Sequence, residues 1–334
     1  MLRKIDWESQ IGRRLRLRDL HVFSTVVQRG SMAKAAQHLG VSQPAISEVI
    51  ADLEHALGVR LLDRSAQGIE PTIYGGALLK RSVAVFDELK QSIRDIEFLS
   101  DGTTGEVRIG CMEPPWFTLV PDVIRRFSQQ YPRLQVQTNL IDHSEAFLAL
   151  RERRYDCVLI PMRRGLQDKA ADDLTVEILY DDAVIIAAWA HSKWARRRKI
   201  DLAELIDEPW ILPGPTTWSS PWSEEVFRAA GLSCPNPRIA TNSIILRARL
   251  IAGSPYLGLF LTSVLRGLIS DNYALTALPV DLHANARSIA IVTLKNRTLS
   301  PVVERFLICV REVAASFAGK PAGRAAPSPR RNVS

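Results

Sequence analysis

The chain has 334 residues, of which 46% are hydrophobic and 24% charged, and its formal net charge is +7. This composition is ordinary for a globular protein, and the length suits two or three compact units. No apolar run is long enough for a membrane helix, and the first residues lack the apolar core of a secretory signal. Four single cysteines without C-x-x-C spacing favour a reduced, cytoplasmic protein over a disulfide scaffold.

The positive charge is concentrated at the two ends of the chain. Residues 1–18 carry six basic and two acidic side chains, and residues 319–334 carry four basic and no acidic ones. The chain between them is therefore close to neutral. Basic termini attract phosphate loosely, but they occur equally as solubilising tails, so net charge alone does not establish nucleic-acid binding.

Residues 17–58 predict three successive helices, because apolar residues recur at helical spacing and each segment ends at a glycine. Ser31 and Ser42 precede the second and third helices as N-caps. Pro44 stands in the first turn of the third helix, where a missing N–H costs nothing. The terminating glycines are Gly30, Gly40 and Gly58.

Only Gly40 and Val41 separate the second and third helices, and so short a turn is typical of a helix-turn-helix. We expect Gln43 and Ser47 to share the outward face of the third helix. Residues near the start of a recognition helix reach base edges; Gln suits adenine, and Ser serves base or phosphate. The alternative is an ordinary three-helix core with a polar outer face.

The segment after the third helix predicts a hairpin and then a long helix. Two short extended pieces around a polar turn would form a wing, with Arg60 and Arg64 beside the phosphates, or Arg64 in the minor groove. Thr72 would cap a helix that continues to about residue 100. Its apolar stripe needs a partner to cover it, most simply another copy of the chain. Residues 101–105 are expected to form a hinge.

From residue 106 the pattern changes to strands that alternate with helices, which predicts an α/β unit with a mostly parallel sheet. The Pro-, Ala-, Arg- and Ser-rich residues 319–334 are expected to be disordered. The expected strands are Val107–Gly110, Leu134–Leu140, Cys157–Pro161, Ala183–Ala188, Arg238–Thr241, Leu257–Phe260 and Ser288–Leu294. The expected helices are Leu119–Tyr131, Ser144–Arg153, Asp201–Ile206, Ser220–Ala230, Ser243–Ile251 and Pro301–Phe317.

Residues 30–47 read GSMAKAAQHLGVSQPAIS, residues 50–64 read IADLEHALGVRLLDR, and residues 71–75 read PTIYG. Together they resemble the DNA-binding signature of LysR-type transcriptional regulators. The remaining chain is similar to the family's effector domain, with GEVRIG at 105–110 as its opening strand and PWILP at 209–213 as a later segment. Some relatives with a similar later segment are grouped with the regulator of a sugar-binding protein gene.

The resemblance implies an N-terminal winged helix-turn-helix (1–71), a linker and dimerisation helix (72–100), and a two-lobed effector domain (106–318) like that of periplasmic binding proteins. Lobe I would comprise about 106–180 and 289–318, and lobe II 181–288. Crossing strands near Ala183–Ala188 and Ser288–Leu294 would form the hinge between the lobes.

The implied partners are double-stranded operator DNA, a small-molecule effector, and further copies of the chain in a homodimer or homotetramer. RNA polymerase is a further implied partner, and no cofactor, metal or membrane is expected. The predicted location is the cytoplasm, at the nucleoid. The DNA-contacting residues would be Ser31, Lys34, Ser42, Gln43, Pro44, Ser47, Arg60 and Arg64.

The recognition helix departs from the family pattern in its charge. Glu48, Ala51 and Asp52 stand where relatives commonly have basic or amide residues. Because an acid facing phosphate is unfavourable, we expect fewer phosphate contacts from this helix and more from the basic termini. The wing also has a second leucine, Leu62, in place of the usual phenylalanine, and its turn lacks a common basic pair.

Candidate effector ligands follow the strands of both lobes, where α/β domains bind small molecules. Glu113, Trp116 and Trp218 favour a sugar, whereas Arg163 favours an organic or aromatic acid. The alternative is that Glu113 and Trp116 pack without touching a ligand. The full set of candidates is Met112, Glu113, Trp116, Met162, Arg163, Thr216, Thr217, Trp218, Thr241, Asn242 and Ser243.

Two other classes of protein fit less well. An enzyme is not expected, because the chain lacks G-x-S-x-G, a P-loop, H-E-x-x-H and G-x-G-x-x-G, and its six histidines are widely spaced. An exported solute-binding protein with an accessory module is not expected either, because no signal peptide begins the chain.

Overall fold

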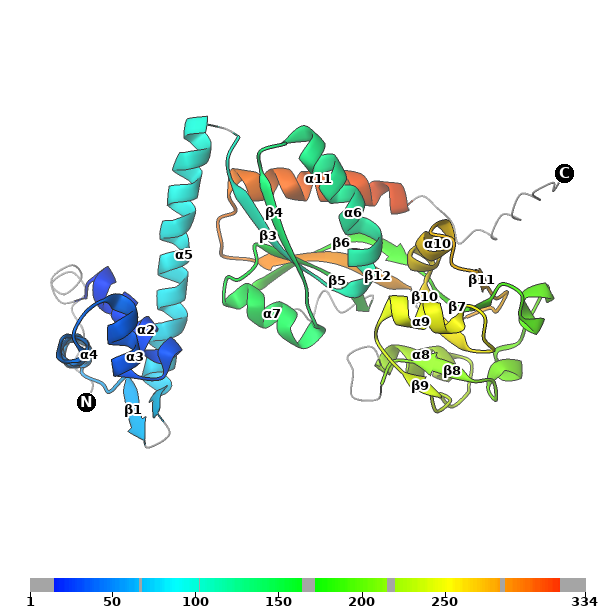
Figure 1. The fold of residues 1–334 in the computed structure, drawn as a ribbon, viewed down its shortest axis with the longest axis horizontal. Helices are drawn as coiled ribbons and strands as arrows, with labels where there is room; N and C mark the ends of the chain where they lie inside the picture. Colours follow the sequence, from blue (N-terminus) through cyan, green and yellow to red (C-terminus); the bar gives the residue numbers. More distant parts are fainter. Residues whose placement is uncertain are drawn as a thin grey trace. The chain divides into compact units, whose positions relative to one another are not determined.

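The computed structural model describes residues 15–65, 68–101, 103–163, 172–214, 220–282 and 286–318. The chain divides into two compact units, Met1–Arg94 and Asp95–Ser334 (Figure 1). Thr216, Thr217 and Trp218, and the predicted tail, lie outside the described residues. No described helix has both the length and the hydropathy needed to cross a membrane.

The first unit is built on three helices, α2 (Leu17–Arg29), α3 (Met32–Leu39) and α4 (Gln43–Leu57). Each ends at the predicted glycine, which adopts a φ of 63 to 68°; only glycine takes this left-handed conformation at no steric cost. The core between the helices includes Phe23, Val26, Ala35, Ile46, Ile50 and Leu53, all 1% exposed or less. The helix-turn-helix prediction is confirmed. Leu17, the first residue of α2, is 48% exposed.

The predicted hairpin is present as β1 (Leu62–Ser65) and β2 (Gly68–Pro71), which pair antiparallel. Two contacts attach it to the helices. The Glu54 carboxylate accepts hydrogen bonds from the amides of Leu61 and Leu62, at 2.6 and 3.2 Å. The Ile69 amide donates to the Gly30 carbonyl at 3.0 Å. The geometry of the wing therefore depends on α2 and α4 together.

A single long helix, α5 (Ile73–Asp101), follows the hairpin. The Thr72 hydroxyl accepts from the Gly75 amide at 3.1 Å and donates to the Arg60 carbonyl at 2.8 Å. Thr72 thus caps the helix, as predicted, and ties it to the hairpin. Gly75 lies so close to Leu61 that a Cβ at this position would stand 2.0 Å from the Leu61 carbonyl oxygen. Glycine is therefore required here by space.

The second unit contains two five-stranded sheets, each belonging to one lobe. The strand order of the first sheet is β4-β3-β5-β12-β6, and that of the second is β11-β7-β10-β8-β9. The strands of the first are β3 (Glu106–Cys111), β4 (Gln135–Leu140), β5 (Cys157–Arg163), β6 (Leu174–Asp182) and β12 (Arg287–Leu294). Those of the second are β7 (Val184–Trp189), β8 (Trp210–Leu212), β9 (Ile239–Ala240), β10 (Leu257–Leu261) and β11 (Leu275–Ala277).

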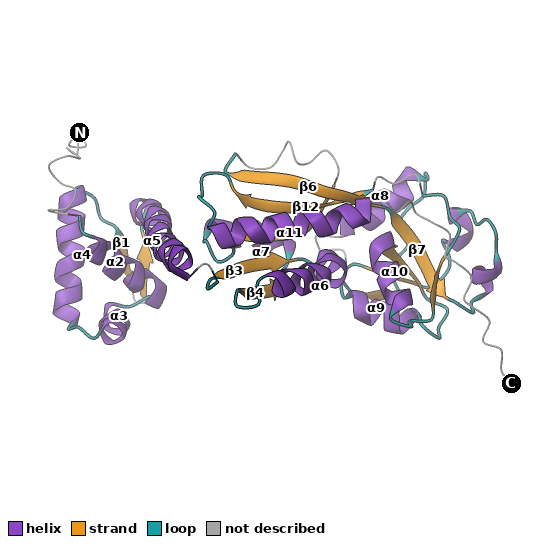
Figure 2. Cartoon of the chain, turned by 90° about the horizontal axis from the view of Figure 1, so that it is seen from above, coloured by secondary structure: helices purple, strands orange, loops and turns teal. Residues whose placement is uncertain are grey.

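Residues that alternate along a strand serve opposite faces of the first sheet, as the two-residue period of a strand requires. On β5, Cys157 and Leu159 belong to the core under helices α6 and α11, whereas Val158 and Ile160 belong to the core under α7. Figures 1 and 2 show α6 and α11 side by side over the sheet. These helices are α6 (Glu113–Gln130), α7 (His143–Arg151) and α11 (Pro301–Ala318).

The second sheet is covered on both faces in the same way. Trp210 and Leu212 of β8 face a core shared with α8, whereas Ile211 faces the core shared with α9 and α10. Its helices are α8 (Ser220–Ala229), α9 (Ile244–Ile251) and α10 (Thr262–Ser270), with short 3-10 turns η2 (Lys193–Arg196) and η3 (Leu202–Leu205). The two-lobed architecture is confirmed.

The chain passes from one sheet to the other at Ala183, between β6 and β7, and returns between β11 and β12. The first crossing is held by α10: the Thr262 amide and hydroxyl both donate to the Ala183 carbonyl at 2.9 Å. The buried Asp182 carboxylate accepts from the Ser263 amide at 3.1 Å and from its hydroxyl at 2.5 Å.

Several sequence expectations for this unit are wrong. The sheets are mixed, because β12 runs antiparallel to β5 and β6, and β7 runs antiparallel to β10 and β11. Strands β6, β8 and β11 and helix α10 were not expected: β8 and β11 have three residues each, and α10 contains Gly267. Helix α6 begins at Glu113, well before the expected Leu119, because its two prolines occupy the first turn. The expected helix Asp201–Ile206 is instead the short 3-10 turn η3.

Gly75→Ala is expected to lower the free energy of unfolding by about 1–3 kcal/mol, because the added Cβ would overlap a backbone oxygen that cannot rotate away. Gly76→Ala is the matched control, since a Cβ there meets nothing within 4 Å. Alanine in a helix is favoured over glycine by about 0.5–1 kcal/mol, so this control should be stabilising. Urea unfolding followed by circular dichroism measures both, and equal midpoints for the two variants would contradict the steric argument.

Candidate nucleic-acid interface and ligand cavity

The start of α4 is exposed and capped. The Ser42 hydroxyl accepts a hydrogen bond from the Ala45 amide at 3.4 Å, and Pro44 lies in the first turn. Gln43 and Pro44 are both exposed. The side-chain amide of Gln43, the first residue of the helix, is therefore exposed to solvent.

Ser47 lies one turn further along α4 but is only half-exposed. Its hydroxyl lies 3.2 Å from the Met32 sulfur, so it packs back toward α3. Ser31 is the half-buried N-cap residue of α3, and Lys34 is exposed on the same helix. The structure therefore places Gln43 further from the core than Ser47, although the two residues share a face of α4.

The hairpin carries two exposed arginines. Arg60 lies two residues before β1, and Arg64 lies on β1 opposite Ile69. Neither forms an ion pair with another described residue. Their charges are therefore available to an external anion such as a phosphate.

The acids of α4 face the start of α2. Glu48 and Asp52 line one pocket together with Arg16 and Arg18. Asp19 and His55 line the same pocket, so acidic and basic side chains are mixed there.

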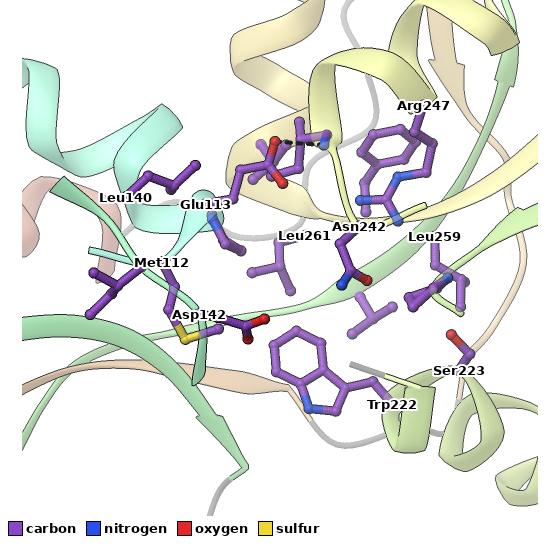
Figure 3. A pocket seen from close by; sticks show the side chains of 17 residues that line it. Met112, Glu113, Leu140, Asp142, Trp222, Ser223, Asn242, Arg247, Leu259 and Leu261 are labelled. Carbon is purple, nitrogen blue, oxygen red and sulfur yellow. Dashed lines mark hydrogen bonds between the residues drawn. The ribbon is translucent and has the colours of Figure 1, made fainter. Parts of the chain in front are cut away.

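A cavity of about 310 Å³ lies in the second unit and is lined from both lobes (Figure 3). Lobe I contributes the start of α6 and the segment after β4, and lobe II contributes β7, β10, α8 and α9. The lining residues are Met112, Glu113, Pro114, Leu140, Ile141, Asp142, Val184, Pro213, Trp222, Ser223, Asn242, Ile244, Arg247, Leu259, Phe260, Leu261 and Val264.

Glu113 connects the lobes across this cavity. Its carboxylate accepts a hydrogen bond from the Ile244 amide at 2.7 Å, at the start of α9 (Figure 3). Burial raises the pKa of Glu113, against the lowering effects of this hydrogen bond, of Arg247 and of Ser243. Ser243 also caps α9, accepting from the Leu246 amide at 3.3 Å.

Arg247 is the one cationic residue among the described residues that line the cavity. It is 8% exposed, and its guanidinium carbon lies 4.7 Å from the centre of the Phe260 ring. Burial lowers the pKa of Arg247 to about 10, which the negative charge of Glu113 partly opposes. The group therefore stays charged at neutral pH.

Only some of the effector-binding residues predicted from the sequence line the cavity. Met112, Glu113 and Asn242 line the cavity, and Thr241 and Ser243 lie beside it at the start of α9. Trp116 packs against the core of the unit, and Met162 against the core under α7. Arg163 instead pairs with Glu225 of α8 at 3.2 Å.

Arg247, Asp142 and Trp222 line the cavity but were missed from the sequence. Arg247 had a usable signal: it lies at helical spacing between Ile244 and Ile251, on the otherwise apolar buried face of α9. An arginine on such a face needs an anion or an aromatic ring. Asp142 and Trp222 carried no comparable signal, because only the fold brings their segments to the cavity.

The buried cysteines of lobe I are poorly suited to covalent catalysis. Burial raises the pKa of both the Cys111 and the Cys157 thiols, which makes them poor nucleophiles. No group of three His, Cys, Asp or Glu side chains within the described ranges is arranged to hold a metal ion.

Two family models match the chain. The bacterial regulatory helix-turn-helix protein, lysR family, matches residues 17–76. The LysR substrate binding domain matches residues 100–315, more than half of the chain. One model matches within each compact unit.

Curated relatives match over most of their length. The HTH-type transcriptional regulator GbpR of Azospirillum brasilense is 27% identical over 308 residues, which cover 89% of this chain and 86% of GbpR. The regulator GalR of Pseudomonas putida is 26% identical and is covered to 73%, against 89% of this chain. The regulator YybE of Bacillus subtilis is 30% identical over 289 residues, covering 86% of this chain and 95% of YybE.

Solved structures share the fold. A full-length OxyR variant from Pseudomonas aeruginosa aligns with a TM-score of 0.62 at 18% identity, over 90% of this chain and 94% of that one. CbnR, a LysR family regulator, aligns with a TM-score of 0.59 at 19% identity, over 90% and 99%. The chain therefore belongs to the LysR family: it is a LysR-type DNA-binding transcriptional regulator with an effector-binding domain.

Proposed function

We propose that this regulator reads operator DNA with the start of α4, and that a small molecule in the interlobe cavity modulates the outcome. The observation that carries the DNA half is the exposed position of Gln43 and Pro44 at the capped start of α4. This end of a recognition helix is the part that reaches base edges in the major groove. A glutamine amide donates and accepts in the pattern that adenine presents.

Backbone contacts would come from other elements. The exposed Lys34, Arg60 and Arg64 support phosphate binding by α3 and the wing. Ser31 and Ser42 stand at helix starts, whose free amides attract phosphate. Because Glu48 and Asp52 are exposed acids of α4 and would repel phosphate, we expect α4 itself to contribute few phosphate contacts.

Retardation of the DNA upstream of the protein's own gene tests the proposal directly. We expect retardation that weakens steeply as salt is raised, because bound phosphates release counterions. Lack of any retardation at low salt, by protein with the circular dichroism of a folded chain, would contradict it. A regulator that acts on chromosomal DNA is expected to work in the bacterial cytoplasm, at the nucleoid.

The effector half is supported by the cavity between the lobes. Its volume, about 310 Å³, is in the range of small-molecule sites. Glu113 and Ile244 join the two lobes at its edge. A ligand in the cavity therefore has groups of both lobes to bind, and a change in lobe closure is the expected signal.

The linker helix supports assembly with a second copy of the chain. Val85, Leu89, Ile93, Ile96 and Leu99 of α5 recur at helical spacing and are 39–78% exposed. A stripe of this kind on a long helix is stable in water only when it is covered. A second α5 supplies the matching apolar surface.

Gln43→Ala is expected to cost about 1–3 kcal/mol of discrimination at one base position, because the alanine cannot form the paired contacts to the base. Binding to operator variants, each with one base pair changed, measures this. Gln28→Ala is the control, since Gln28 is an equally exposed amide on α2 and should leave discrimination unchanged. A uniform loss at every site would instead make Gln43 a backbone contact.

Ile93→Asp is expected to weaken self-association by tenfold or more, because a charge would be buried against the apolar partner helix at a cost of about 1.4 kcal/mol or higher. Sedimentation velocity over a range of concentrations measures it. Lys90→Asp is the matched control: it is exposed on the same helix but lies outside the apolar stripe. Equal sedimentation of both variants would argue against α5 as the interface.

A further inference from the structure

The guanidinium of Arg247 lacks a direct counterion. It makes no hydrogen bond and no ion pair with any residue in the part of the chain that the structure describes. Its Nε–H is buried without a hydrogen-bond partner. The guanidinium carbon lies 4.7 Å from the centre of the Phe260 ring.

Glu113 does not act as the direct counterion of Arg247. It is close enough to influence Arg247 electrostatically, but its carboxylate is hydrogen-bonded to the Ile244 amide and forms no ion pair with the guanidinium. A buried charge is costly unless it is paired and hydrogen-bonded. Arg247 therefore has donors that an anion in the cavity would satisfy.

The side chains that form the cavity walls indicate the chemistry of the rest of the ligand. Beside Arg247 the cavity is formed mainly by aliphatic and aromatic side chains, among them Leu259, Leu261, Val264 and Trp222 (Figure 3). A sugar hydroxyl that lies against these walls would lose its hydrogen bonds to water. They favour an apolar body.

The charges of the lining limit the ligand to one negative group. Glu113 and Asp142 are both carboxylates of the same cavity, against the single positive charge of Arg247 among its described lining residues. A second carboxylate or a phosphate on the ligand would face like charge in a poorly solvated site.

We infer that the cavity binds small monocarboxylic acids with an aromatic or branched aliphatic body, and that Arg247 anchors their carboxylate. This inference rests on the proposed effector role of the cavity and names its ligand class. The carboxylate would accept hydrogen bonds from the guanidinium, which are among the strongest that proteins form with ligands. The apolar body would lie against the walls of β10 and α8.

Two acid–amide pairs test the charge directly on the full-length protein: 3-phenylpropionate with 3-phenylpropanamide, and 4-methylpentanoate with 4-methylpentanamide. Each pair shares the same body and differs in a carboxylate against a neutral carboxamide, and D-galactose serves as the polyol. We expect at least one acid to raise the melting temperature saturably and to bind about tenfold or more tightly than its amide in calorimetry. If neither acid binds better than its amide, or if galactose binds better than both acids, the inference is wrong.

Arg247→Met keeps the volume and removes the charge, and should weaken acid binding about 10- to 100-fold. Arg249→Met is the matched control, because Arg249 is exposed on the same helix, and should bind the acids like the wild type. Arg247→Lys retains the charge without the planar fork and should bind with intermediate affinity; it also serves if the methionine variant fails to fold. Unchanged acid binding in both Arg247 variants would overturn the assignment.

Measuring retardation of operator DNA without ligand distinguishes a failure of this inference from a failure of the proposed DNA-binding function. Protein that retards its operator but ignores the acids would contradict the ligand class alone. Protein that binds an acid through Arg247 but never retards DNA would contradict the DNA-binding half and leave the ligand class supported.

Discussion

Glu113 at the start of α6 accepts a hydrogen bond from the first amide of α9, and this contact joins the two lobes beside the cavity. The amides at a helix start carry partial positive charge, so a carboxylate is stabilised there. The same contact keeps Glu113 from pairing fully with Arg247, one turn further along α9. The contact between the lobes therefore also affects the electrostatics of Glu113 in the cavity.

A second set of charges holds the wall formed by α8. Glu225 of α8 accepts from the fully buried Arg287 at 2.7 Å and pairs with Arg163 at 3.2 Å. Both arginines lie at the ends of strands in lobe I, and Arg287 also stacks over the Trp222 ring, 4.7 Å from its centre. These contacts join α8, which lines the cavity, to the strands of lobe I.

In the DNA-binding unit, a helix-ending glycine and a carboxylate hold the wing against the helices. Gly30 ends α2 in a left-handed conformation, and its carbonyl accepts from Ile69 of the wing. Glu54 holds the other strand through two amides. The recognition helix and the wing thus share one support, and the spacing between Gln43 and Arg64 follows from it.

The sequence by itself determined the helix-turn-helix, because caps, glycines and a helical period act between neighbours in the chain. It also determined most strands of the lobes. Strands β8 and β11 were not predicted, because three residues are too few to show a pattern of alternation. Strand β6 was not predicted, because this edge strand is buried at only some of its positions. Only the tertiary structure decided the ligand site: Glu113 and Ile244 are separated by 131 positions, and Asp142, Trp222 and Arg247 meet them from other parts of the chain. No local sequence pattern predicts that these residues come together, because their proximity depends on how two sheets and their helices pack.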